Sequence, residues 1–144
     1  MKTIPRKTDR SLPMALLRAR ESVMARFRPL LAAHGMTEQQ WRVLRVLNES
    51  GPLDATRLSN RCCILRPSMT LILRTLAGRK LITRRGHAED GRRLILKATP
   101  KAIALIQRVT PHTNAIYRDI EVEFGRERVE RLLDILEELA QTRR

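Results

Sequence analysis

An arginine interrupts the apolar face of the first helical pattern in the chain. Leu16, Val23 and Phe27 recur at helical spacing, and Arg20 stands on the same stripe where a leucine is expected. A guanidinium held on such a face needs a carboxylate beside it. Arg28 follows two turns after Arg20.

A second group of polar residues suits a polyanion. From Pro67 to Lys80, the apolar residues fall on one side of a helical pattern, which leaves Thr70 and Arg74 on the outer side. Arginine on such a helix reads guanine in the major groove of duplex DNA, and hydroxyl groups read base edges or phosphates. The residues that we expect to contact DNA from this helix are Arg66, Pro67, Ser68, Thr70, Leu71 and Arg74.

The net charge and its distribution also favour a polyanionic partner. The 144 residues include 29 Lys and Arg against 15 Asp and Glu, a formal charge of +14, but only 3% are aromatic. So few aromatics disfavour the stacking platforms of single-strand binders, which leaves duplex DNA or an anionic surface. The segment 61–97 holds ten basic and two acidic residues, whereas 98–144 is neutral. Disorder is disfavoured because 42% of the residues are apolar and these residues are patterned.

The motifs give no support to enzyme chemistry. There is no CxxC, HExxH, GxSxG or phosphate-cradling glycine motif, so we expect no catalytic residue, metal or cofactor. The adjacent Cys62 and Cys63 have poor geometry for a disulfide with each other, which fits a reducing compartment. We expect small buried thiols, and a redox switch is the alternative. Without a signal-peptide pattern or membrane span, a cytoplasmic protein is expected.

The hydrophobic periodicity predicts a single, mainly α domain with a small β-hairpin. The N-cap candidates Ser11, Thr37 and Asp54, together with turn signals, place helices at about 12–34, 37–50, 54–60 and 67–80. A period of two predicts a hairpin over 82–98, Thr99-Pro100 starts a long helix, and a last helix follows Gly125. Three short helices followed by a basic hairpin have the layout of a winged helix-turn-helix.

Three stretches of the sequence resemble the multiple-antibiotic-resistance regulator (MarR) family. They are HGMTEQQWRVLRVL, LSNRCCILRPSMTLILRTLAGRKLITRR and DGRRLILKAT. Within that family, TEQQWR together with CILRPS is most similar to regulators of homoprotocatechuate (4-hydroxyphenylacetate) degradation operons. The resemblance implies one MarR-type domain over 1–144, with dimerisation helices at 12–34 and 100–144 and a winged helix-turn-helix DNA-binding lobe at 37–99.

The same resemblance implies roles for the hairpin, or wing. Asp90 and Arg92 match the family's Asp-x-Arg motif, in which the aspartate braces the hairpin through an ion pair and the arginine contacts DNA. Arg84, His87 and Arg93 are further candidate DNA contacts. Because family members are homodimers, two-fold symmetry predicts a pseudo-palindromic operator with half-sites about one helical turn apart.

In this family, effectors bind between the dimerisation helices and the DNA-binding lobe. The resemblance therefore implies that Arg20 and Arg28 clamp the carboxylate of a small aromatic acid. Two alternatives remain open: Arg20 pairs with a structural Glu or lies at the dimer interface, and Trp41 serves the core. The candidate effector-binding residues are Arg20, Met24, Phe27, Arg28, Trp41 and Arg45.

These features predict a homodimeric transcriptional regulator that responds to a ligand. The form we favour is a repressor of an aromatic-compound catabolic operon, released from its operator by a small aromatic acid. The alternatives are a cysteine-based redox-sensing repressor and an architectural DNA-binding protein with no preference for promoter over random duplex. An enzyme acting through His87, Glu89 and Asp90, or through a cysteine thiolate, lacks a companion base or metal ligand.

Overall fold

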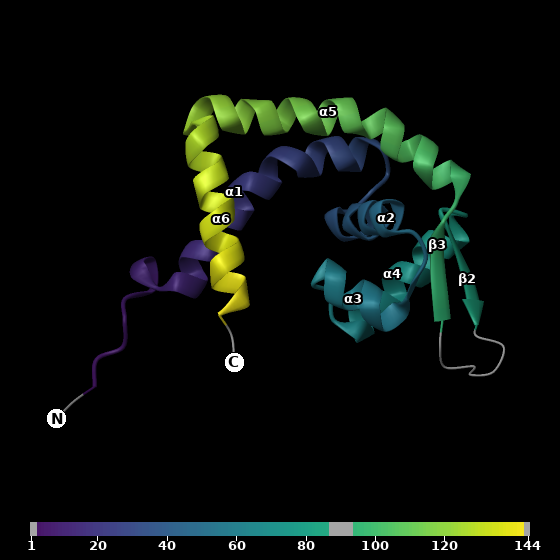
Figure 1. The fold of residues 1–144 in the computed structure, drawn as a ribbon, viewed down its shortest axis with the longest axis horizontal. Helices are drawn as coiled ribbons and strands as arrows, with labels where there is room; N and C mark the ends of the chain where they lie inside the picture. Colours follow the sequence, from purple (N-terminus) through teal and green to yellow (C-terminus); the bar gives the residue numbers. More distant parts are fainter. Residues whose placement is uncertain (1–2, 87–93, 143–144) are drawn as a thin grey trace. The chain divides into compact units, whose positions relative to one another are not determined.

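The computed structural model describes residues 3–86 and 94–142, and its elements confirm the mainly α fold with a β-hairpin wing (Figure 1). Two units make up the chain, residues 1–109 and residues 110–144, and each is described by itself. No helix of the described residues is long and apolar enough to cross a membrane. The elements are the 3-10 helix η1 (Thr8–Arg10), α1 (Leu12–Ala33), α2 (Glu38–Ser50), β1 (Leu53–Asp54), α3 (Ala55–Cys62), α4 (Arg66–Gly78), β2 (Ile82–Gly86), β3 (Leu94–Ala98), α5 (Pro100–Phe124) and α6 (Arg126–Gln141).

Side-chain caps fix where four of the helices begin. The Ser11 hydroxyl accepts from the third backbone N–H of α1, and Asp54 accepts from the third of α3 at 2.8 Å. Thr37 and Gln40 form a reciprocal capping box at α2, with both hydrogen bonds at 3.1 Å. Thr99 accepts from the first turn of α5. Each of these caps satisfies backbone donors that a helix leaves unpaired, and all four were predicted from the sequence.

The turn between α3 and α4 differs slightly from the prediction. Helix α3 continues to Cys62 instead of ending near Asn60, and Cys63 then adopts the left-handed conformation with φ of 55°. The backbone N–H of Cys63 bonds to the carbonyl of Asn60, and that of Ile64 bonds to the carbonyl of Ser59. This left-handed end redirects the chain, so that α4 begins three residues later at Arg66.

The wing is a three-stranded antiparallel sheet in the order β1-β3-β2. Arg84 pairs with Leu96 and Arg85 with Ile95. Because Leu96 is fully buried and side chains alternate along a strand, Arg84 lies on the core side of the sheet and Arg85 on the opposite side. Strand β1 was not predicted, since its two residues show no period. Residues 87–93 of the hairpin lie outside the described residues.

The apolar core lies in the unit of residues 1–109. Helix α2 contributes Val43, Leu44 and Leu47, and α3 contributes Leu58, all at 2% exposure or less. Helix α4 buries one side against them, which fixes α4 relative to α2 and α3 in the helix-turn-helix order. Helix α6, in the other unit, buries none of its residues.

Candidate DNA interface and effector site

Helix α4 has the two faces that a recognition helix requires. Met69, Ile72, Leu73 and Leu76 are at most 8% exposed, whereas the outer face is open to solvent. Thr70 donates its hydroxyl proton to the Arg66 carbonyl at 3.1 Å and stays exposed. Among the described residues no carboxylate pairs with the guanidinium groups of this face. All six residues of the predicted set are exposed, namely Arg66, Pro67, Ser68, Thr70, Leu71 and Arg74.

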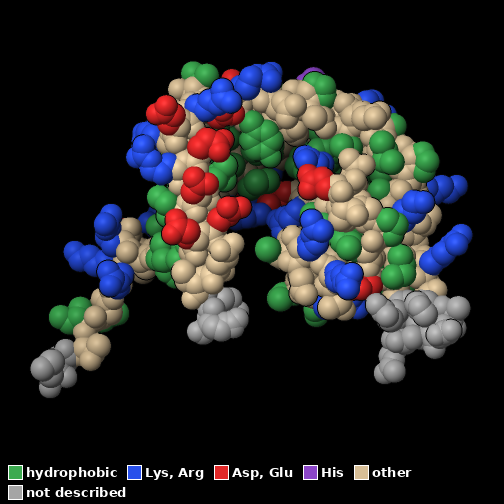
Figure 2. All heavy atoms as spheres, viewed as in Figure 1, with side chains coloured by type: hydrophobic (Ala, Val, Ile, Leu, Met, Phe, Trp, Pro, Cys, Tyr) green, Lys and Arg blue, Asp and Glu red, His purple; other side chains and the backbone are tan. Residues whose placement is uncertain are grey.

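The wing carries the second part of the predicted DNA contact surface. Arg84 is exposed on β2. Figure 2 shows basic side chains that project from the strands of the wing. The remaining wing predictions lie outside the described residues, namely His87, Asp90, Arg92 and Arg93.

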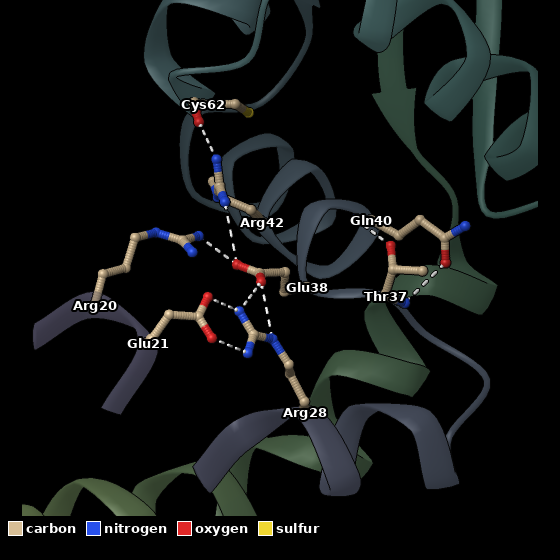
Figure 3. Close-up of polar contacts among 8 residues, drawn as sticks. All are labelled: Arg20, Glu21, Arg28, Thr37, Glu38, Gln40, Arg42 and Cys62. Carbon is tan, nitrogen blue, oxygen red and sulfur yellow. Dashed lines mark hydrogen bonds and ion pairs between the residues drawn. The ribbon is translucent and has the colours of Figure 1, made fainter. Parts of the chain in front are cut away.

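The carboxylate that Arg20 and Arg28 require is supplied by Glu38, the first residue of α2. Arg20 donates to Oε2 of Glu38, and Arg28 donates to Oε1 through Nε at 3.1 Å and Nη2 at 2.9 Å. Arg28 also holds Glu21 in a two-point pair, with both bonds at 2.8 Å (Figure 3). The structure thus has the contact with a glutamate that the sequence left open as an alternative for Arg20.

These pairs set the protonation of the groups involved. Burial raises the pKa of the Glu38 carboxyl, but hydrogen bonds from Arg20 and Arg28 outweigh it and hold that pKa below its ordinary value. The hydrogen bond from Arg28 likewise lowers the pKa of Glu21. The Arg28 guanidinium has a raised pKa because Glu21 and Glu38 both accept from it. Glu21, Arg28 and Glu38 are therefore all charged near neutral pH.

Arg42 joins this cluster to the helix-turn-helix, and it was not among the residues predicted from the sequence. Its Nη2 lies 3.5 Å from Oε2 of Glu38, one turn earlier on α2, and its Nη1 donates to the Cys62 carbonyl at 2.8 Å. The spacing of Glu38 and Arg42 is the only signal in the sequence, because i,i+4 pairs of opposite charge face each other on a helix. We call Glu38, Arg20, Arg28 and Arg42 the Glu38 cluster.

The other effector candidates occupy different surroundings. Arg45 lies over the Trp41 ring at 6.0 Å from its centroid and pairs with Glu49 on the helix surface at 2.9 Å. Trp41 is half-buried, as is Met24, whereas Phe27 is only 5% exposed and belongs to the core. Trp41 and Arg45 therefore offer an aromatic wall beside a cation with a weak, solvent-exposed ion pair.

One cavity of about 430 Å³ opens beside the Glu38 cluster. Its size falls within the range of small-ligand sites. Of the predicted effector residues only Arg20 lines it, and the remaining lining comes from the start of α2 and the α3–α4 turn. The lining residues are Arg20, Thr37, Glu38, Gln39, Arg42 and Cys63.

The two cysteines differ, which corrects the expectation that both are buried. Cys62 is buried, and burial raises the pKa of its thiol to about 11, so its thiolate is scarce near neutral pH. Cys63 is exposed, because its left-handed backbone turns the chain outward at the end of α3. The exposure of Cys63 could not be predicted from the sequence, because a left-handed conformation is uncommon for any residue other than glycine, asparagine or aspartate.

Sequence comparison decides the family. The MarR family profile matches residues 36–94. The homoprotocatechuate degradative operon repressor of Escherichia coli is 42% identical over 128 residues, which cover 89% of this chain and 86% of the repressor. The chain belongs to the MarR family.

Solved structures that resemble this chain over nearly its whole length agree with the assignment to the MarR family. The crystal structure of NadR in complex with 4-hydroxyphenylacetate has a TM-score of 0.82 and 39% identity, and the match covers 99% of this chain and all of NadR. The transcriptional repressor CouR, bound to a 23-mer DNA duplex, has a TM-score of 0.83 and 27% identity over 98% of this chain and all of CouR. This MarR-family protein is thus a winged-helix transcriptional regulator, and its relatives are regulators and not enzymes.

Replacing Glu38 by glutamine is expected to lower the free energy of unfolding at pH 7 by about 1–3 kcal/mol, because guanidinium groups lose a shared, largely buried carboxylate. The pKa of Glu38 is lowered in the folded protein, so this stability is present above the ordinary value of 4.5. The advantage of the wild type should therefore shrink as the pH falls below 4.5 and through the lowered pKa of folded Glu38. Urea unfolding of the wild type and Glu38→Gln, at pH 7 and at a pH below 4.5, measures how this difference in stability changes.

Glu49→Gln serves as the matched control, because Glu49 pairs with Arg45 on the exposed surface of the same helix. Its effect should stay within about 0.5 kcal/mol at either pH. If Glu38→Gln were as stable as the wild type at pH 7, the cluster would contribute no net stability.

Proposed function

We propose that this MarR-family regulator is a homodimeric repressor of an aromatic-compound catabolic operon, which a small aromatic acid releases from a pseudo-palindromic operator. The observation that carries the proposal is the 42% identity, over most of both chains, to a homoprotocatechuate operon repressor. NadR, at 39% identity, was crystallised with 4-hydroxyphenylacetate, an acid of the expected chemistry. In support, the predicted residues include guanidinium groups for the carboxylate of such an acid and the Trp41 ring for its aromatic ring.

DNA binding falls to the outer face of α4 and to the wing. The exposed arginines and hydroxyls of α4 match the donors that read base edges and phosphates in a major groove. Arg84 lies on the core side of the wing sheet, and its strand β2 contacts α4. A wing placed beside the recognition helix reaches the adjacent backbone or minor groove, which is the role proposed for Arg92 and its neighbours.

The effector is proposed to place its ring against Trp41 and its carboxylate on a guanidinium of the predicted set. Two guanidinium sites compete for that carboxylate. Arg20 and Arg28 are already satisfied by Glu38, so an acid must displace or share Glu38 to bind there. Arg45 has an exposed ion pair with Glu49, which an acid replaces at little cost.

A thermal-shift and DNA-binding experiment tests this function. In the wild type, 4-hydroxyphenylacetate should raise the unfolding temperature of the protein. It should also dissociate the protein from a DNA fragment that contains the region upstream of its gene, measured by fluorescence anisotropy. Arg20→Ala and Arg45→Ala, tested separately, assign the carboxylate to whichever variant loses the thermal shift. An acid series that neither stabilises the wild type nor releases DNA would contradict the proposed response.

The same DNA titration distinguishes the proposed repressor from the alternative, an architectural DNA-binding protein. A sequence-tolerant protein binds the upstream fragment and a random duplex of equal length with the same affinity, and both affinities fall steeply with salt. The redox alternative loses support at Cys62, whose buried thiol has a raised pKa. Alkylation of Cys63 that leaves operator affinity unchanged would remove that alternative altogether.

A further inference from the structure

We propose that Arg42 is the positioning residue through which the Glu38 cluster controls the turn between α3 and α4. The inference rests on the proposed function, because it says how an acid bound at α1 would reach the DNA-binding helix. Arg42 makes one contact in each direction. One side of its guanidinium faces Glu38 at 3.5 Å, and the other donates to the Cys62 carbonyl at 2.8 Å (Figure 3).

The contact at Cys62 gives a side-chain partner to a backbone carbonyl at the end of α3. The last carbonyl groups of a helix have no partner within the helix, and the Arg42 guanidinium supplies one at the final residue of α3. Cys63 then takes the left-handed conformation, and α4 begins at Arg66. A guanidinium that holds this carbonyl therefore acts together with the backbone bonds of Cys63 and Ile64 to position the start of α4. Arg66 and Ser68 are among the DNA contacts proposed for the first turn of α4.

The contact at Glu38 makes Arg42 sensitive to events on α1. Glu38 has two oxygens, and Arg20, Arg28 and Arg42 share them, with Arg42 at the longest distance. An acid that takes Arg20 or Arg28 leaves the carboxylate with fewer cationic partners. Glu38 then attracts Arg42 more strongly, and the hydrogen bond to Cys62 weakens. The cavity lined by Arg20, Glu38, Arg42 and Cys63 gives these side chains room to move.

The variant Arg42→Lys tests the coupling, because lysine keeps the charge beside Glu38 but has no planar fork to bridge Glu38 and the Cys62 carbonyl. The readout is the factor by which 4-hydroxyphenylacetate weakens DNA binding. We expect Arg42→Lys to bind this acid with an affinity within about threefold of the wild type, measured by calorimetry. If the acid weakens DNA binding of the wild type by a large factor, Arg42→Lys should reduce that factor at least about tenfold; if the wild-type factor is small, Arg42→Lys should bring it below about twofold. Arg57→Lys, which changes an exposed arginine of α3 that pairs with Asp54, should keep the wild-type factor. An unchanged factor in Arg42→Lys would overturn the proposal.

A second experiment, which needs no ligand, measures the alkylation rate of Cys63. It tests the coupling even if 4-hydroxyphenylacetate has no effect on the wild type, a result that would contradict the proposed function but not the role of Arg42. Cys63 is exposed beside the contact, whereas Cys62 is buried, so alkylation by iodoacetamide reports on the turn. We expect Glu38→Gln and Arg42→Lys each to change the alkylation rate of Cys63 at least about threefold, and Glu38→Gln to have no further effect in the Arg42→Lys background. Independent, multiplicative effects of the two substitutions would overturn the coupling, as would rates equal to those of the wild type and Arg57→Lys.

Discussion

Replacing Arg74 by alanine is expected to weaken operator binding at least about tenfold without a loss of stability. Arg74 lies on the exposed face of α4, one turn after Thr70, and no described carboxylate holds its guanidinium. A bidentate contact between arginine and guanine contributes about 1–3 kcal/mol of discrimination. A symmetric dimer makes the contact twice, so the weakening of the full complex is expected to exceed that of a single contact.

The salt dependence of binding shows which kind of contact Arg74 makes. If it reads a base, Arg74→Ala should keep the wild-type slope of log affinity against log salt and lose preference at one base pair of each half-site. If it binds a phosphate, the slope should fall by about one for each phosphate that the variant no longer neutralises. Arg108→Ala, an exposed arginine of α5 outside α4 and the wing, removes the same charge and should leave the affinity near that of the wild type. Wild-type affinity in Arg74→Ala would remove α4 from the interface.

Local signals explain which parts of the fold could be predicted from the sequence. Ser11, Thr37, Asp54 and Thr99 act within three residues of their own helix starts, so their caps follow from sequence spacing alone. The exposed face of α4 follows from the period of its apolar residues in the same way. Strand β1 could not be found, because its two residues are defined by pairing with a strand about forty residues later.

The candidate site shows the same division between local and distant information. An arginine on an apolar stripe implies a carboxylate, and that requirement could be stated for Arg20 from the sequence. The choice of Glu38, which lies on another helix, could not, because nothing in the sequence ranks one distant glutamate above another. The contact of Arg42 with the Cys62 carbonyl was hidden for a further reason, since backbone acceptors leave no trace in residue identity.

Replacing Leu133 by glutamate is expected to dissociate the proposed dimer and to weaken operator binding by about a hundredfold or more. Helix α6 buries none of its residues, and Leu132, Leu133, Ile135 and Leu139 are each 39–53% exposed. Acidic side chains lie along the face of α6 that Figure 2 turns to the viewer, so this helix is amphipathic rather than apolar all round. An apolar stripe of this kind on a terminal helix suits a second copy of the same helix pair.

The expected loss of DNA binding follows from avidity. Two linked recognition helices bind two half-sites, and the second contact is made at a high effective concentration that can add about 10² to 10⁴ in affinity. A monomer keeps every residue of α4 and loses only this factor. Sedimentation equilibrium should therefore show Leu133→Glu as a folded monomer, with Gln141→Glu as a control that adds the same charge to the same helix. A Leu133→Glu protein that stayed dimeric would move the interface away from α6, whereas a monomer with wild-type operator affinity would show that symmetry contributes nothing to DNA recognition.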